Sequence, residues 1–381
     1  MPITIRPIET TNRRDFEAFL HFPWRIYCDE KGRRKDPYWV PPLLPDQREL
    51  LDKRRNPFFE HAETQCFMAY DEKGELVGRI CATVDQNHIK THNEKAGFFG
   101  FFECIEDQGV ADALLETAAK WNRERGMEIM RGPANLSSND DWGCLIQGFL
   151  GPPPVMMPHN PPYYAELFER HGMTKAHDLL SHLVPSLLPF PDRVMRVAER
   201  SRKRNRIVVR HLDMKHFDRD VEHIMNIYNK AWAQNWGFVP MTENEFRHLA
   251  AKLKQVVRKE FIFLIEMDGQ VVAMNVLLPN LNQALIHMNG EFDLAGILKF
   301  LWYRREINTV REIIMGVLPE YRNKGIQAII HIEAMRTAQK HKMWYGDISW
   351  TLEDNDLVNN EVRAMGGVLY KKYRLFDKKL I

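Results

Sequence analysis

Hydrophobic positions recur along this chain with two different periods, which predicts a protein of mixed strands and helices. Runs rich in β-branched and aromatic residues alternate with segments whose apolar residues recur every three to four positions. Residues 64–70 and 75–84 flank a turn ending in glycine, and residues 261–267 and 270–278 flank Asp-Gly. Asp-Gly between two such runs is a strong hairpin signal, so each half of the chain is predicted to contain a β-hairpin.

The predicted elements occur twice in the same order. Three residue pairs share one spacing: Gly109 and Gly325, Met127 and Met343, and Asn139 and Asn355. The offset is 216 in each case, as in 325 − 109 and 343 − 127. In the first two pairs a glycine precedes an amphipathic helix and a methionine follows it. The sustained offset predicts a diverged tandem duplication.

Each half is predicted to fold as a mixed twisted sheet flanked by helices, an α/β architecture. The predicted order is a first strand, one or two helices, the hairpin, a further strand, the glycine-led helix, and then a strand, a helix and a closing strand. Residues 1–185 form the first predicted domain and residues 206–381 the second. A proline-rich stretch and a helix at 186–205 form the predicted linker.

Composition and charge exclude several classes of protein. The 44% hydrophobic and 27% charged residues are typical of a globular chain. Lys plus Arg (53) nearly balances Asp plus Glu (51), and no apolar run reaches the roughly 20 residues of a membrane span. We therefore expect no membrane and no nucleic-acid partner, and a cytoplasmic location. Five scattered cysteines predict neither a disulfide framework nor a metal site.

One segment joins a strand to features that suit a phosphate. The apolar run 311–318 leads through Pro319 into Arg322-Asn-Lys-Gly325 and then a helix. A helix N-terminus offers unpaired N–H groups and a partial positive charge. Gly325 allows close approach of a ligand, and Arg322 and Lys324 add cationic donors. The segment therefore predicts a diphosphate site.

The same segment resembles the acyl-CoA-binding motif of the GNAT superfamily of acyl-CoA N-acyltransferases. The matching motif positions are Val317, Pro319, Tyr321, Arg322 and Gly325. Gln327 stands where the motif has a small residue. The resemblance covers most of residues 206–381 and, more faintly, the first half. It implies two tandem GNAT-like domains.

The resemblance also implies where a cofactor binds. In that superfamily the fourth and fifth strands diverge, and acetyl-CoA or another acyl-CoA lies between them while an amine attacks its thioester directly. The implied cofactor-binding residues are Met315, Gly316, Val317, Leu318, Arg322, Asn323, Lys324, Gly325, Ile326, Gln327 and Asn355. Backbone donors aimed at the developing oxyanion are expected to be the main catalytic contribution.

The catalytic side chains are less clearly marked. Glu312 and Glu353 are the candidate general bases, and each is equally compatible with a solvated or salt-bridged carboxylate. The superfamily's usual general-acid tyrosine is replaced by Val362. Tyr373 is the candidate acid, although both Tyr370 and Tyr373 also fit a place in the core.

The first half has a different loop at the equivalent place. Arg322–Gly325 of the second half aligns with Glu106-Asp-Gln-Gly109, which is acidic. Carboxylates repel a diphosphate, so the first half is predicted to keep the fold and to have lost the cofactor.

The predicted activity is an acyl-CoA-dependent N-acyltransferase, most simply an acetyltransferase, acting on a primary amine of a small molecule or peptide. Two alternatives stay open: a non-catalytic acyl-CoA sensor, and a GNAT-like transferase that uses an aminoacyl-tRNA donor. The Trp- and Asn-rich segments 231–240 and 280–290 form either a substrate pocket or packed loops.

Overall fold

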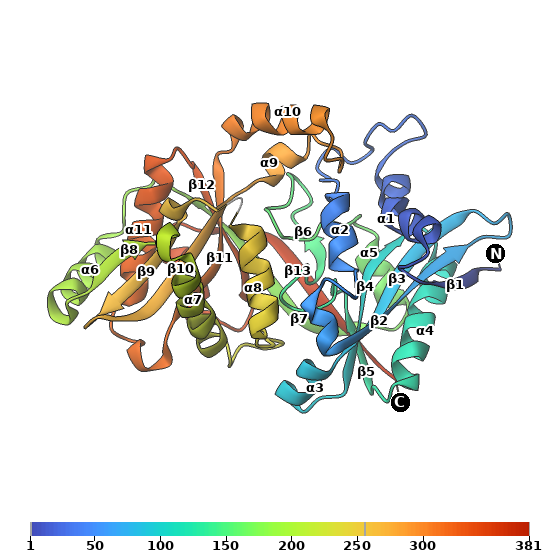
Figure 1. Cartoon of the computed structure of the whole chain (residues 1–381), viewed down its shortest axis with the longest axis horizontal. Coiled ribbons are helices and arrows are strands. Elements are labelled where there is room, and N and C mark those ends of the chain that lie inside the picture. Colours follow the sequence, from blue (N-terminus) through green and yellow to red (C-terminus); the bar gives the residue numbers. More distant parts are fainter. Residues whose placement is uncertain (1, 255–256, 381) are drawn as a thin grey trace. The chain divides into compact units, whose positions relative to one another are not determined.

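The computed structural model describes residues 2–254 and 257–380, and its internal contacts divide the chain into two units (Figure 1). Unit 1 comprises Met1–Leu179, Asn282–Arg304 and Lys371–Ile381, and unit 2 comprises Leu180–Leu281 and Arg305–Tyr370. Each unit contains a mixed sheet with helices on both faces, which confirms the predicted α/β class.

Unit 1 has the strand order β1-β2-β3-β4-β5-β13, with β6 also paired to β13. β4 and β5 run parallel, whereas the neighbouring pairs β1/β2, β2/β3, β3/β4 and β5/β13 are antiparallel. The helices α4 and α5 bury an apolar cluster on one face, and α1 buries another on the opposite face. The elements are β1 (Thr4–Ile8), α1 (Arg13–Tyr27), α2 (Leu44–Leu50), β2 (Ala62–Tyr70), β3 (Leu76–Asp85), α3 (Gln86–His92), β4 (Ala96–Cys104), α4 (Gln108–Glu124), β5 (Ile129–Gly132), β6 (Cys144–Gln147), α5 (Tyr164–Arg170), α9 (Asn282–Leu285) and α10 (Leu294–Tyr303).

Unit 2 repeats this plan with the order β7-β12-β11-β10-β9-β8. β11 and β12 run parallel, and β8, β9, β10 and β11 pair antiparallel in turn. The helices α6 and α11 cover one face of its sheet, and α7 and α8 cover the other. The elements are α6 (Asp192–Asn205), β8 (Val208–His211), α7 (Phe217–Ala231), α8 (Glu243–Leu253), β9 (Ile262–Met267), β10 (Gln270–Pro279), β11 (Thr309–Val317), α11 (Ile326–Lys340), β12 (Tyr345–Leu352) and α12 (Asp356–Ala364).

Two of the three residue pairs at the offset of 216 occupy the same place in each unit. Gly109 lies in the first turn of α4 and Gly325 precedes the first residue of α11, while the methionines that follow these helices are both buried. The third pair was a wrong match. Asn355 caps α12, whereas Asn139 lies in the connection 133–163 that precedes α5. This connection is much longer than its counterpart 353–355, so the offset ends there.

The closing strands each contribute to both units. β7 (Thr174–Pro185) places residues 174–179 in unit 1 and 180–185 in unit 2, and β13 (Val368–Lys379) crosses from unit 2 into unit 1 after Tyr370. Inside unit 1, Phe376 of β13 pairs with Gly132 of β5. The domain boundaries at 185 and 206 stay a prediction from the sequence. They divide the chain into continuous segments, whereas each unit is defined by contacts and combines segments that are separate in the sequence.

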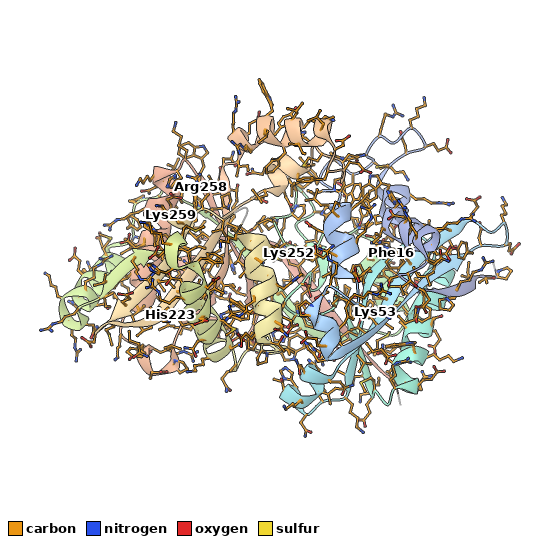
Figure 2. All side chains as sticks on the ribbon, viewed as in Figure 1. Phe16, Lys53, His223, Lys252, Arg258 and Lys259 are labelled. Atoms are coloured by element: carbon orange, nitrogen blue, oxygen red, sulfur yellow. The ribbon has the colours of Figure 1, made fainter. Side chains whose placement is uncertain are left out.

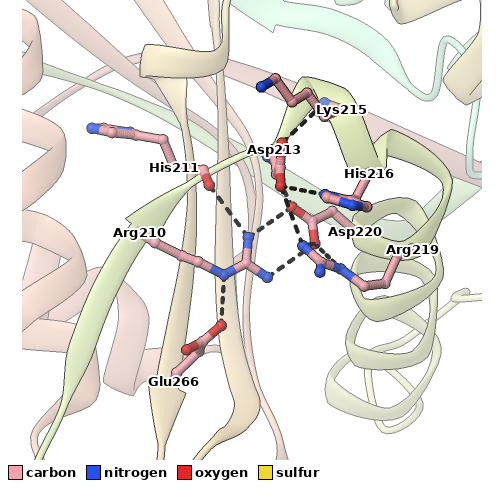
Figure 3. A network of polar contacts seen from close by, with 8 residues as sticks. All are labelled: Arg210, His211, Asp213, Lys215, His216, Arg219, Asp220 and Glu266. Carbon is pink, nitrogen blue, oxygen red and sulfur yellow. Dashed lines mark hydrogen bonds and ion pairs between the residues drawn. The ribbon is translucent and has the colours of Figure 1, made fainter.

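A polar network connects β8 to α7 and β9 in unit 2 (Figure 3). Arg210 donates to the two carboxylate oxygens of Asp220 at 2.7 and 2.9 Å, and to Glu266 at 2.6 Å. Burial acts to raise the pKa of Asp220, but the hydrogen bonds from Arg210 and the backbone outweigh it and lower that pKa. These partners satisfy one another, so the network is structural.

Candidate functional site

A cleft opens where β11 and β12 diverge in unit 2. The two strands pair only from Thr309 with Tyr345 to Glu312 with Ile348, although both continue beyond that point. The resulting cavity has a volume of about 250 Å³. Because parallel strands that separate expose unpaired backbone groups on their facing edges, this cleft can accept a chain that pairs with the backbone.

Aromatic side chains line one part of this cleft. The indole N–H of Trp232 donates to the carbonyl of Met315 at 3.0 Å, and the Trp232 ring meets Trp350 edge to face with centroids 5.8 Å apart. The amide of Leu318 donates to the carbonyl of Val272 at 2.9 Å. These two backbone groups are therefore already hydrogen-bonded, and Gly316 and Val317 line the cleft between them.

The N-terminus of α11 borders the same cleft. Gly325 immediately precedes α11 with a φ of 75°, in the left-handed region that favours glycine, and no side chain caps this helix. Arg322 and Gln327 line the cavity, and the Arg322 guanidinium donates to the carbonyl of Ala231 at 2.8 Å. The amides of the first turn have no intrahelical acceptors and lie beside a cation, an arrangement that suits an anionic group.

The structure brings six of the eleven predicted cofactor residues to the wall of the cleft. They are Met315, Gly316, Val317, Arg322, Gln327 and Asn355. Asn323, Lys324 and Gly325 form the loop that leads into α11. The side chains of Leu318 and Ile326 are buried in apolar clusters, so only their backbone groups are available to a ligand.

The three predicted catalytic residues lie in different surroundings. Glu312 lines the cleft and accepts a hydrogen bond from the buried amide of Asn275 at 2.8 Å. Glu353 is half-buried in the turn after β12. Tyr373 is fully buried in unit 1, on β13 opposite Leu145, and is not among the residues of unit 2. The catalytic roles of all three stay predictions.

Val362, at the place of the superfamily's tyrosine, is fully buried beside Val184 and Met365.

A buried polar network around Asp347 of β12 was not predicted from the sequence. Asp347 accepts hydrogen bonds from the hydroxyls of Ser181 (3.1 Å), Ser349 and Tyr370.

The neighbouring strand supplies a cation to this network. Arg311 is paired in register with Asp347 and donates to the Ser349 hydroxyl at 3.0 Å. Burial raises the pKa of Asp347, although its hydrogen-bond donors oppose the shift. The available sequence signal was one charged residue of opposite sign, Arg311 and Asp347, in each of two strands predicted to be largely buried. The network fixes the strands just where they begin to diverge.

Unit 1 differs at the end of the corresponding strand. Asp107 caps α4, because its carboxylate accepts the amide of Val110 at 3.0 Å. The N-terminus of α4 is therefore already bound to the Asp107 carboxylate, and Glu106 adds a second negative charge in the same turn. The loss of the cofactor from unit 1 stays a prediction, and the self-capped helix supports it.

Several general features of the described residues bear on the remaining expectations. The five cysteines are free and buried, and no group of three potential metal ligands occurs in residues 2–254 and 257–380. Within the same ranges, no helix has the length and apolar character needed to cross a bilayer. Cationic side chains occur on both units, for example Lys53 on unit 1 and Lys252 on unit 2 (Figure 2).

Comparisons with known proteins identify two relatives of nearly the same length. Protein YghO of Escherichia coli is 35% identical over 376 residues, covering 97% of this chain and 94% of YghO. A bacterial ceramide synthase of Caulobacter vibrioides is 34% identical over 388 residues, covering 99% of this chain and 98% of the synthase. No protein-family model matches the chain.

Solved structures show the same fold at low identity. A tandem GNAT protein from the clavulanic acid biosynthesis pathway superposes with a TM-score of 0.56 and 10% identity, covering 100% of this chain and 99% of that one. A GCN5-related N-acetyltransferase from Sphaerobacter thermophilus gives a TM-score of 0.52 and 12% identity over 99% and 96% of the two chains. The tandem GNAT architecture predicted from the sequence is confirmed.

Proposed function

The chain belongs to the family of Escherichia coli YghO and the Caulobacter bacterial ceramide synthase and has the tandem GNAT fold, and from this premise we propose that it is an acyl-CoA-dependent N-acyltransferase. The observation that carries the proposal is the cleft of unit 2, where diverging strands meet the uncapped N-terminus of α11. The backbone N–H groups that could bind a diphosphate and the strand edge that could pair with an extended pantetheine arm then border the same cavity.

In this proposal the donor is an acyl-CoA and the acceptor is a primary amine. The amine nitrogen forms a bond to the thioester carbon, the carbon–sulfur bond breaks, and the proton released by the nitrogen accompanies the departing thiol. Gly316 and Val317 orient the thioester through their backbone, which supplies most of the rate by positioning. Glu312 is the nearest candidate to accept the proton, because its carboxylate is held on the cleft wall by Asn275.

A more specific acceptor is favoured by one observation. The relative named a bacterial ceramide synthase is 34% identical along 98% of its length, which is a likeness of the whole protein. A ceramide is the amide of a fatty acid with a long-chain amino alcohol, so its synthesis is itself an N-acylation. We therefore propose a fatty acyl-CoA and a long-chain amino alcohol as the first pair to test, ahead of acetyl-CoA and a small amine.

Binding and turnover measured separately distinguish the candidate functions. Acetyl-CoA and palmitoyl-CoA are titrated by calorimetry, and release of the CoA thiol is then followed with sphinganine, ethanolamine or a lysine peptide as acceptor. An N-acyltransferase gives thiol release that requires the amine and an amide product identified by mass spectrometry. Binding without turnover on every amine would favour an acyl-CoA sensor. No binding of either thioester would refute the proposal and favour an aminoacyl-tRNA donor.

A further inference from the structure

Unit 1 contains a second cleft at the place that corresponds to the cleft of unit 2. β4 and β5 pair only from Ala96 with Ile129 to Phe98 with Arg131, while β4 continues to Cys104. The cavity at this divergence has a volume of about 260 Å³. The duplicated cleft therefore persists in unit 1, although the neighbouring helix α4 is closed to a diphosphate by its own capping aspartate.

Two opposite charges lie across the strands that form this cavity. Arg79 of β3 is paired in register with Glu103 of β4, and both residues line the cavity. The guanidinium of Arg79 is buried, with 5% of the residue exposed, and donates through Nη1 to the carbonyl of Phe19 at 2.7 Å. Its Nε–H has no hydrogen-bond partner among the described residues. A buried donor without a partner costs free energy unless a ligand or water accepts from it.

The carboxylate of Glu103 lies beside two tyrosine hydroxyls, those of Tyr27 and Tyr164. The hydroxyl of Tyr164 donates to its Oε2 at 2.5 Å, and the same hydroxyl accepts from the amide of Cys104 at 3.0 Å. Burial raises the pKa of Glu103 to about 7, because the opposing effects of Arg79 and the two tyrosines Tyr27 and Tyr164 are smaller. A carboxylate in this environment gains most from a cationic partner that enters the cavity.

A histidine adds a second polar group to the wall. His159 Nε2 contacts Asp36 at 2.6 Å, and its side chain is 3% exposed. Its Nδ1 has no partner within residues 2–254 and 257–380. Nδ1 is therefore available for a hydrogen bond with a polar group of a ligand.

The rest of the cavity wall combines apolar side chains with polar ones, among them Asp46, Asn135 and Asp141. Trp39, Phe101 and Phe168 line it, and α9 contributes Asn282 and Leu285. α9 packs on α10, whose outward side chains are apolar and exposed. The exposed apolar residues of α10 are Leu294 (74%), Leu298 (59%), Leu301 (41%) and Trp302 (63%), and Phe292 (61%) is exposed just before the helix. Leu294, Leu298, Leu301 and Trp302 follow the i, i+4, i+7, i+8 spacing of one helix face.

We propose that the cavity of unit 1 binds a primary amine that carries a neighbouring oxygen and a long apolar chain. The ammonium group pairs with Glu103, the oxygen accepts from Arg79 Nε–H, and the chain leaves past α9 along the apolar face of α10. This inference rests on the proposed function, which supplies the acceptor class, and adds a binding site for that class in unit 1. In this arrangement the duplication gave each cleft a different ligand.

The test uses the full chain and sphinganine as the probe, followed by the change in tryptophan fluorescence. Saturable binding of sphinganine is expected, with ethanolamine bound far more weakly because it lacks the chain. Glu103→Gln is expected to weaken sphinganine about tenfold or more, since it removes a charge-assisted contact. Glu106→Gln, an exposed carboxylate of the same unit, is the matched control and is expected to have no effect.

Two further measurements test the contribution of the apolar chain separately from that of the amine. Leu298→Ser with Trp302→Ser is expected to weaken sphinganine at least about tenfold and to leave ethanolamine unchanged. Hexadecanol, which has the chain and no amine, is expected to bind weakly and to be insensitive to Glu103→Gln. Equal sphinganine affinity in Glu103→Gln and the native chain, with both proteins shown to be folded by thermal unfolding, would overturn the inference. Acyl-CoA titration of the same variants tests the proposed function independently, because the inference leaves that affinity unchanged.

Discussion

Reversing the two cations beside α11 is the most direct test of where acyl-CoA binds. In Arg322→Glu with Lys324→Glu, the loop of unit 2 acquires the acidic character of Glu106 and Asp107 in unit 1. Arg322 lines the cleft, and the Lys324 ammonium lies 4.7 Å above the Tyr321 ring. Both side chains are therefore at the helix end that is proposed to hold the diphosphate, and the variant opposes like charges there.

The size of the effect follows from the contacts that are lost. A charge-assisted hydrogen bond contributes about 1.5–3 kcal/mol, so two of them amount to about 3–6 kcal/mol. Because Arg322 is exposed, the lower value is the appropriate one, which corresponds to at least about a hundredfold weaker binding. The effect on folding is expected to stay below about 1 kcal/mol, since the Arg322 guanidinium makes an exposed hydrogen bond to the Ala231 carbonyl.

The assay is a calorimetric titration of the acyl-CoA at two salt concentrations, with thermal unfolding measured on each variant. Lys340→Glu with Lys342→Glu is the matched control, because it reverses two exposed cations at the opposite end of the same helix, about 20 Å away. The control is expected to bind as the native chain does. Undiminished affinity in the Arg322 and Lys324 double variant would show that the diphosphate lies elsewhere and would refute this reading of α11.

Three other outcomes are expected. Turnover should fall less than about tenfold in each of the single variants Glu312→Gln, Glu353→Gln and Tyr373→Phe, because positioning lowers the reaction barrier more than a single general acid or base does. A thousandfold loss of turnover in one of them, with acyl-CoA affinity intact, would identify a dedicated catalytic group. Trp232→Phe removes the indole N–H bond to a β11 carbonyl and should raise the KM for the acyl-CoA several-fold without a comparable change in kcat or in the free energy of unfolding; an unchanged KM would contradict that role. Glu103 has a folded pKa near 7, above its ordinary 4.5, so the native chain is most stable below the ordinary value and loses stability as pH rises through about 7. Glu103→Gln should therefore stabilise the protein by about 3 kcal/mol at about pH 8 and by little at about pH 4, measured by denaturant unfolding.

Local pattern was enough to determine the elements and their duplication. The hairpin 262–279 and the helix after Gly325 follow from residue spacing and turn chemistry, which act over a few neighbours in the chain. The loop Arg322–Gly325 correctly predicted where α11 begins, because the start of a helix is determined by the local sequence and backbone. The resemblance to the GNAT superfamily then implied the divergence of two strands, and the structure contains it.

Tertiary structure alone decided which residues share a site. The burial of Tyr373 in unit 1 follows from the pairing of β13 with β6, strands more than two hundred positions apart, and no local pattern specifies that pairing. The same holds for Trp232 on the β11 carbonyl and for Arg79 opposite Glu103, which meet only after the sheets have formed. Periodicity reports what one segment prefers, whereas a cleft depends on the distance between segments, and that distance is fixed by packing across the whole unit.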